Sequence, residues 1–311
     1  MTTGAIFDNH MNDAAAPGRL ARYFAVDGRR RYMLFVLPAI AVMMAVIIFP
    51  WLFTFFMSVH DWRIGQAKTF VGLDNYLNLF KDERFHNSVW VTLVFTALSV
   101  VLPVILGVAS ALVFHRKFPL RGLLRGVFIM PMMATPVAVA LVWTMMFHPQ
   151  LGVLNYILSL VGIPPSLWVF DQATVIPSLV LVETWQWTPL VMLIVLGGLA
   201  SLPTEPYESA LIDGATPWQM FRNITFPLVL PFIMVATIIR TIDAVKSFDT
   251  IFVITLGGPG TASETINLYL YTQAFAFYQI GYASAMVVVF MIVIMALCLI
   301  LLYLRQRAQW T

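Results

Sequence analysis

Long apolar runs dominate the pattern of hydrophobic and polar positions along the chain. A helix needs about 20 apolar residues to cross the hydrocarbon core of a bilayer. Six runs are long enough, at about 33–57, 88–114, 123–147, 174–200, 229–255 and 283–304. The first is too long for the core of a signal peptide, and no small-residue cleavage site follows it. The pattern predicts an all-α integral membrane protein with six transmembrane helices.

Basic residues predict how these helices are oriented, because Lys and Arg are enriched in short cytoplasmic segments. Five arginines precede the first run, four basic residues and no acid lie at 116–125, and two arginines follow the last run. The segment 148–173 contains neither Lys nor Arg. We therefore expect both termini and the loop 115–122 to be cytoplasmic. The expected outer loops are 58–87, 148–173 and 257–282.

The two ends of the chain are expected to be cytoplasmic tails. Residues 1–31 form the first tail, and its first 18 residues have little to bury, which predicts disorder. Residues 32–304 form the transmembrane domain, and residues 305–311 form the second tail.

Composition supports a membrane environment. Hydrophobic residues make up 60% of the 311 residues, charged residues 11%, and the mean hydropathy is +0.85, whereas soluble domains carry about 25% charged residues. The net charge of +3 comes from basic clusters beside apolar runs. We therefore expect lipid around the chain and no nucleic-acid partner. The one cysteine, Cys298, lies in an apolar run, which leaves no disulfide or thiolate metal site.

The connection 201–227 is predicted to be cytoplasmic, yet it is acidic. Thr204 is a suitable N-cap for a short helix, and Gly214 is placed to end that helix in a left-handed conformation. Thr216 and Pro217 then begin a second short helix. The expected structure is helix, glycine turn, helix, lying on the cytoplasmic surface.

One face of the first short helix should carry Tyr207, Ala210 and Leu211, which are three and four positions apart. An amphipathic pair held between two membrane spans has the form of a knob that fits the groove of a partner. From the pattern alone, an ordinary interfacial helix is an equally good interpretation.

In this connection, Glu208-Ser209-Ala210 is followed after three residues by Gly214 and after nine more by Ile224-Thr225-Phe226-Pro227. This pattern resembles the EAA loop of ABC-importer permeases. The family pattern is Glu-Ala-Ala, three residues, Gly, nine residues, then Ile, any residue, Leu, Pro. Here Ser209 and Phe226 depart from it, and the spacing is intact. The resemblance implies a coupling helix that docks on a separate ATPase subunit. The residues implied at that contact are Glu208, Ser209, Ala210, Gly214, Ile224 and Pro227.

Outer segments are similar to those of carbohydrate-type permeases, in the maltose-permease F-type branch. The similar segments are 70–76, the Gly257-Gly258-Pro259 triplet and 281–285, and the resemblance extends from about 33 to 304. It implies a bacterial cytoplasmic (inner) membrane protein in a heterodimer with a second homologous permease subunit. The other implied partners are an ATP-binding cassette ATPase dimer and an extracytoplasmic solute-binding protein.

The chain lacks the motifs of an ATPase or a hydrolase. A P-loop ends in Gly-Lys-Ser/Thr, and none of the four lysines follows a glycine. The five histidines form no His-Glu-x-x-His pattern, and no nucleophile elbow is present. We expect no catalytic residue, no metal site and no cofactor in this chain, so ATP and Mg should be bound by the partner ATPase subunits.

Placing a polar side chain inside a membrane costs free energy, so such residues mark solute pathways or contacts with partners. In the fourth run, Glu183, Gln186 and Trp187 share one helical stripe with Leu190. Tryptophan offers a flat apolar surface to a sugar ring, while Glu and Gln accept hydrogen bonds from hydroxyls. The alternative is that the tryptophan belongs to an interfacial aromatic belt.

In the fifth run, charges of alternating sign recur every three residues, at Arg240, Asp243, Lys246 and Asp249. For Lys246 and Asp249, mutual neutralisation of the charges along the helix face is an equally good explanation. The family resemblance implies that Arg240, Ala244 and Ser247 line the sugar site, and that Glu183, Gln186 and Trp187 line it from the fourth run. Because charges at 183 and 240 depart from the maltose branch, a sugar, a polyol and a phosphorylated or acidic solute all remain open.

These features favour the transmembrane permease subunit of an ATP-driven importer that works by alternating access. An ion-coupled secondary transporter, with the intramembrane charges as a relay, is the alternative. The chain shows no convincing inverted repeat, which argues against that alternative. A membrane-embedded enzyme is a third possibility, disfavoured by the lack of a nucleophile or metal cluster.

Overall fold

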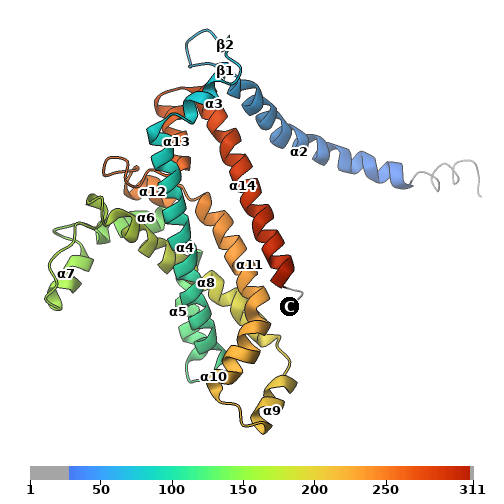
Figure 1. Cartoon of the computed structure of the whole chain (residues 1–311), viewed down its shortest axis with the longest axis vertical. Coiled ribbons are helices and arrows are strands. Elements are labelled where there is room, and N and C mark those ends of the chain that lie inside the picture. The colour runs from blue at the N-terminus through green and yellow to red at the C-terminus, as the bar shows by residue number, and fades with distance from the viewer. Residues whose placement is uncertain (1–27, 309–311) are drawn as a thin grey trace, which may run out of the picture. The chain divides into compact units, whose positions relative to one another are not determined.

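The computed structural model describes residues 28–308, and this part of the chain is mostly helical (Figure 1). It divides into two compact units between Thr54 and Phe55. The first unit consists of most of α2 (Gly28–Ser58), a helix that contains Pro38 and Pro50. The predicted tail 1–31 therefore overlaps α2 at residues 28–31, and its first 27 residues lie outside the described part.

The second unit contains all the remaining elements. They are β1 (His60–Asp61), β2 (Thr69–Phe70), α3 (Asp74–Leu79), α4 (Glu83–His115), α5 (Arg121–Met133), α6 (Pro136–Met146), α7 (Val153–Leu160), the 3₁₀ turn η1 (Trp168–Phe170), α8 (Val175–Ala200), α9 (Glu205–Ile212), α10 (Pro217–Met220), the π turn η2 (Phe221–Thr225), α11 (Phe226–Val245), α12 (Asp249–Ile254), α13 (Ile266–Tyr271), the π turn η3 (Thr272–Ala276) and α14 (Ile280–Ala308). The two strands form one short antiparallel pair, with His60 opposite Phe70.

The all-α membrane class is confirmed. Within residues 28–308, five helices are long and apolar enough to cross a bilayer, and a bent pair raises the number to six if it counts as one span. The last helix, α14, continues to Ala308, so the predicted second tail is helical as far as the structure describes it.

The predicted span 123–147 differs most from the structure, because it is two helices bent by 97°. Helix α5 ends at Met133 and α6 begins at Pro136. Thr135, directly before the proline, is extended, with φ −67° and ψ 141°. The proline ring disfavours helical backbone in the residue before it and suits the first position of a new helix, which explains where the break falls.

The predicted span 229–255 is also interrupted. Helix α11 follows η2 without a gap, ends at Val245, and is separated from α12 by residues 246–248. The side-chain amide of Asn267 donates to the backbone carbonyl of Val245 at 3.1 Å. A helix end inside a membrane protein needs such a partner, because lipid cannot satisfy a free carbonyl.

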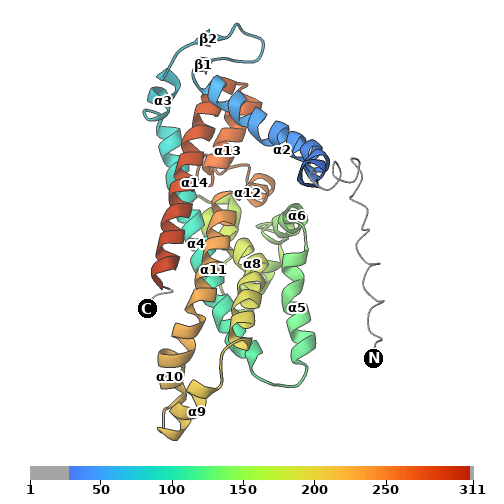
Figure 2. The same ribbon diagram turned by 90° about the vertical axis from the view of Figure 1, so that its right-hand side faces the viewer.

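Helices α4, α8 and α11 pack side by side in the centre of the second unit (Figure 2). A Cβ added to Gly107 on α4 would lie 2.6 Å from the Cβ of Val191 on α8. Small residues permit this close approach, which is how membrane helices commonly pack. The buried face of α4 carries the small residues Ser88, Thr92, Thr96, Ser99, Gly107 and Ala111.

The two ends of the second unit are formed by different helices. Helices α9 and α10 lie at one end, and α3 and α13 lie at the other (Figures 1 and 2). His115 and Arg116, at the end of α4, line a cavity of about 850 Å³ together with Tyr207 and Trp218. The basic loop 115–122 and the acidic connection 201–227 thus lie at the same end of the unit, as their predicted common side of the membrane requires.

Candidate functional site

A buried ion pair joins the two helices that carry the predicted pathway residues. Arg240 on α11 donates from Nη2 to Glu183 Oε2 on α8 at 2.9 Å, and the two residues are 1% and 3% exposed. The same nitrogen donates to the backbone carbonyl of Ser99 on α4 at 3.2 Å. The guanidinium carbon also lies 5.3 Å from the centre of the Trp187 ring. Arg240 therefore binds groups from both neighbouring helices.

The second carboxylate oxygen of Glu183 binds the interrupted part of the fifth span. Thr250 donates to Glu183 Oε1 at 3.2 Å, and Ser247 donates to it at 3.4 Å. Ser247 lies in the break and Thr250 in α12. A buried charge is tolerated only where it is paired and hydrogen-bonded, and Glu183 meets this condition with donors from α11, the break and α12.

A cavity of about 260 Å³ lies beside this ion pair. Five of the seven predicted pathway residues line it, namely Glu183, Trp187, Arg240, Asp243 and Ser247. The other residues lining it are Pro136, Lys246, Phe248, Asp249 and Thr250. The breaks in the third and fifth spans therefore both contribute to the cavity, and irregular backbone at membrane depth is expected only in such a place.

The two remaining predicted residues lie close by without lining the cavity. Ala244 is buried in the last turn of α11. Gln186 is fully buried, and its amide nitrogen donates to the carbonyl of Ala134, at the break between α5 and α6, at 3.2 Å. Gln186 thus holds the bent pair against α8.

Lys246 and Asp249 are exposed, and the described part of the chain contains no ion pair that involves either of them. Both side chains line the cavity. Over residues 28–308, the structure therefore shows no direct ion pair along the helix that neutralises Lys246 or Asp249.

The connection 201–227 folds as helix, glycine turn, helix. Gly214 has φ +73°, the left-handed conformation expected of it. Thr216 caps α10 through a capping box with Gln219. Thr204 occupies the N-cap position of α9, but its side chain makes no capping hydrogen bond. Tyr207 donates to Thr225 Oγ1 at 3.0 Å, which fixes α9 against η2.

The residues of the EAA pattern lie on the surface of this connection. Glu208, Ser209, Gly214 and Pro227 are exposed, while Ala210 and Ile224 are half-buried. Three large apolar side chains beside them are also exposed, with fractions of 62% for Leu211, 88% for Ile212 and 65% for Trp218.

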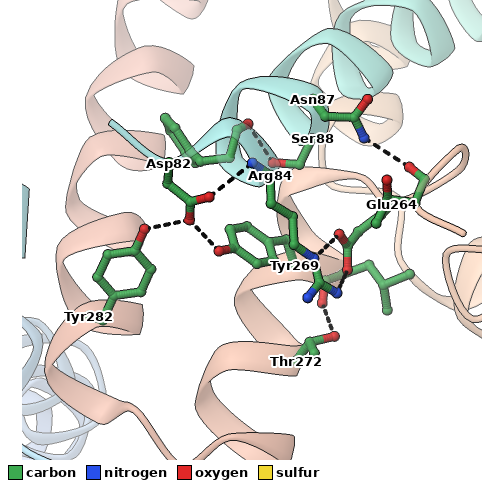
Figure 3. A network of polar contacts seen from close by, with 11 residues as sticks. Asp82, Arg84, Asn87, Ser88, Glu264, Tyr269, Thr272 and Tyr282 are labelled. Carbon is green, nitrogen blue, oxygen red and sulfur yellow. Dashed lines mark hydrogen bonds and ion pairs between the residues drawn. The ribbon is translucent and has the colours of Figure 1, made fainter. Parts of the chain in front are cut away.

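A polar network at the opposite end was not predicted from the sequence (Figure 3). Asp82, the N-cap of α4, accepts hydrogen bonds from the hydroxyls of Tyr269 and Tyr282. Arg84 donates twice to Glu264, at 2.7 Å from both Nε and Nη2. These contacts join the start of α4 to the loop before α13 and to the start of α14.

Burial alone would raise the pKa of the Asp82 carboxyl, but the hydrogen bonds from Tyr269 and Tyr282 outweigh it and hold the pKa below its ordinary value. Burial and the facing carboxylate raise the pKa of Tyr269. The one sequence signal for this network was Glu264, which is the single charged residue in segment 257–282.

The long apolar helices and their bundle define a polytopic membrane protein. The model of the family described as "Binding-protein-dependent transport system inner membrane component" matches residues 103–309, and the chain belongs to that family. Its members are the permease components of ABC importers. The family match therefore supports the prediction of an ATP-driven importer over the alternative of an ion-coupled transporter.

Two curated relatives are similar over most of their length. The trehalose/maltose transport system permease protein MalF of Thermococcus litoralis is 39% identical over 249 residues, which cover 80% of this chain and 83% of that protein. The sulfoquinovosyl glycerol transport system permease protein SmoG of Agrobacterium fabrum is 31% identical, with 92% of this chain and 93% of that protein covered.

A solved structure supports the fold. It is a bacterial ABC transporter involved in the import of the acidic polysaccharide alginate, and one of its chains matches with a TM-score of 0.79. The match covers 92% of this chain and 99% of that chain at 22% identity.

Proposed function

We propose that this chain is the permease subunit through which an ATP-driven importer moves a sugar or a related polyol. The printed names of two relatives support the solute class, since one is a trehalose/maltose system and the other a sulfoquinovosyl glycerol system. The observation that carries the proposal is the cavity beside the ion pair of Glu183 and Arg240, which is lined by polar side chains of α8 and of the interrupted fifth span within an apolar bundle.

The solute pathway is proposed to run past the predicted residues of α8 and α11. Trp187, half-buried beside the cavity, offers its ring to the apolar face of a sugar. Asp243 and Ser247 supply hydrogen-bonding groups for hydroxyls. Glu183, Gln186, Arg240 and Ala244 complete the pathway by holding these elements in register.

Energy is proposed to enter through the connection 201–227. Its EAA-pattern residues are Glu208, Ser209, Ala210, Gly214, Ile224 and Pro227, and they are accessible to a partner. The exposed side chains of Leu211, Ile212 and Trp218 give this surface the apolar contacts that a stable interface needs. Since α9 is tied to η2, and η2 continues into α11, movement of α9 would be transmitted to the helix that carries Arg240.

The proposed assembly contains four further polypeptide chains, two of which form the ATPase dimer. A second homologous permease subunit forms a heterodimer with this chain, an ATP-binding cassette ATPase dimer binds ATP and Mg, and an extracytoplasmic binding protein delivers the solute. The assembly lies in the bacterial inner membrane with both termini of this chain in the cytoplasm. The family description supports the membrane and the binding protein, and the shared end of loops 115–122 and 201–227 supports the orientation.

Alternating access follows from these parts. ATP-driven closure of the ATPase dimer would move the 205–222 helices and open the cavity outward to receive the solute. Hydrolysis would reset the helices and open the cavity inward.

The energy source distinguishes this proposal from ion-coupled transport. Cells that express the complete system should keep importing a radiolabelled sugar substrate after an ionophore collapses the ion gradients, and should stop when ATP is depleted. Import that stops with the ionophore while ATP is unchanged would show that the proposal is wrong.

A further inference from the structure

The positive charge of Arg240 is already neutralised within the protein. Its guanidinium is bound by the Glu183 carboxylate at 2.9 Å and by the Ser99 carbonyl at 3.2 Å, and the residue is 1% exposed. Glu183 in turn uses both of its oxygens, one for Arg240 and one for Ser247 and Thr250. Both carboxylate oxygens of Glu183 are therefore engaged by partners within the protein.

The remaining charges of the cavity favour an uncharged solute. Besides the ion pair, it is lined by Asp243, Lys246 and Asp249. Two carboxylates and one ammonium leave a net negative charge, so an anion entering the cavity meets electrostatic repulsion. Hydroxyl groups suit the same side chains, because carboxylates accept from them and an ammonium donates to them.

We propose that Glu183 determines specificity by neutralising Arg240, so that the cavity admits uncharged polyhydroxylated solutes and excludes those that carry a carboxylate. This inference rests on the proposed function, since it takes the cavity as the passage of the solute. The relatives leave this question open, because their names include both a trehalose/maltose system and a system for sulfoquinovosyl glycerol, a sugar derivative that carries a sulfonate.

The first test uses the wild-type protein in complex with the second permease subunit and the ATPase subunits, without the binding protein, reconstituted in lipid nanodiscs. The probes are matched pairs in which a CH2OH group is replaced by a carboxylate, namely glucose and glucuronate, galactose and galacturonate, and sorbitol and gluconate. Binding is measured from the ligand-dependent rise in melting temperature. For each pair that binds, the uncharged member is expected to bind at least about tenfold more tightly.

The second test uses Glu183→Gln, which keeps the shape of the side chain and leaves Arg240 without its counter-charge. The preference for the uncharged member is expected to fall by about tenfold or to reverse. Glu183→Asp retains the charge and should retain the preference. Glu264→Gln is the matched control, because it removes a carboxylate from the ion pair with Arg84, which does not line the cavity. This variant should bind with the wild-type preference.

A double variant separates the effect of charge from that of shape. Glu183→Gln with Arg240→Gln removes both charges and leaves Asp243, Lys246 and Asp249 in place, so the preference for the uncharged member should return. A single Glu183→Gln variant that assembles with an unchanged preference would overturn the role of Glu183.

Two other outcomes are decisive without any variant. Equal or tighter binding of the carboxylate members by the wild type overturns this inference and leaves the proposed function intact. Failure of every probe, charged and uncharged, to bind overturns the sugar assignment itself, and the inference falls with it.

Discussion

The guanidinium of Arg240 lies 2.9 Å from the carboxylate of Glu183, although 57 residues separate them in the chain. Both side chains are almost completely buried among apolar helices. An ion pair in such surroundings contributes little net stability, because desolvation offsets the Coulomb attraction. Each partner, however, makes the burial of the other possible. The pair therefore fixes α8 and the interrupted fifth span in one mutual arrangement.

The mutual dependence of this pair predicts a non-additive response to substitution. Glu183→Met and Arg240→Met each leave one uncompensated buried charge, and each is expected to destabilise the protein by about 3–5 kcal/mol. The double variant, with no buried charge, should melt at a higher temperature than either single variant. Thermal unfolding of the purified complex measures this. A double variant that loses the sum of both single effects would show that the two side chains do not act as a pair.

The sequence predicted each member of this pair separately. Helical periodicity placed Glu183 and Trp187 on one stripe, and the recurrence of charge marked Arg240. Periodicity describes the face of a single helix and carries no information about which helices meet. The contact of Arg240 with Ser99 spans 141 residues, and no pattern within the α4 segment indicated it.

The spans were predictable because crossing a bilayer requires a continuous apolar run, and hydropathy detects such runs directly. Hydropathy does not detect backbone geometry within a run. The break at Thr135 and Pro136 lies inside one apolar stretch, so the pattern merged α5 and α6. The proline was the available signal, since it biases the preceding residue away from helix.

The polar network around Asp82 was missed for a related reason. Asp82 lies 187 residues from Tyr269 and 200 residues from Tyr282, and tyrosines near a predicted interface ordinarily belong to the aromatic belt. By contrast, the turn at Gly214 was predicted correctly, because helix capping and left-handed backbone are properties of adjacent residues.

Two adjacent glycines in α8 are expected to respond differently to the same substitution. A Cβ at Gly198 would lie 2.5 Å from the ring of Phe232 on α11, whereas a Cβ at Gly197 would meet nothing within 4 Å. Gly198→Ala should separate α8 from α11 and destabilise the protein by about 1–3 kcal/mol. Gly197→Ala should be neutral or slightly stabilising, since alanine favours helix. Melting temperatures of the two variants test this, and equal values would contradict the close packing at Gly198.

The lowered pKa of Asp82 predicts how stability depends on pH. A carboxyl group whose pKa is lower in the folded state stabilises the fold above its unfolded pKa, which is near 3.8. This contribution is lost as the pH falls through the lowered pKa. The difference in melting temperature between the wild type and Asp82→Asn should therefore be largest above pH 3.8 and shrink in more acidic solution.

A neighbouring carboxylate provides the control for this titration. Glu83 is exposed in the first turn of α4, and Glu83→Gln removes a charge from the same helix end. That variant should lack the large difference expected of Asp82→Asn at neutral pH. If the effect of Asp82→Asn instead increased as the pH fell, the tyrosine hydrogen bonds would not be what stabilises the carboxylate.

The turn at Gly214 gives the sharpest test of the proposed coupling surface. Gly214 has φ +73°, and a Cβ added there would meet nothing within 4 Å, so Gly214→Asp introduces no close contact at its Cβ. Gly162, in the predicted outer loop 148–173, also has φ +73° and open space, and Gly162→Asp therefore carries the same backbone penalty of about 1–2 kcal/mol. We expect Gly214→Asp to insert normally, to lose co-purification of the ATPase subunits and to abolish uptake. Gly162→Asp should retain the ATPase subunits. Normal uptake by Gly214→Asp would exclude this connection as the route by which ATP hydrolysis drives transport.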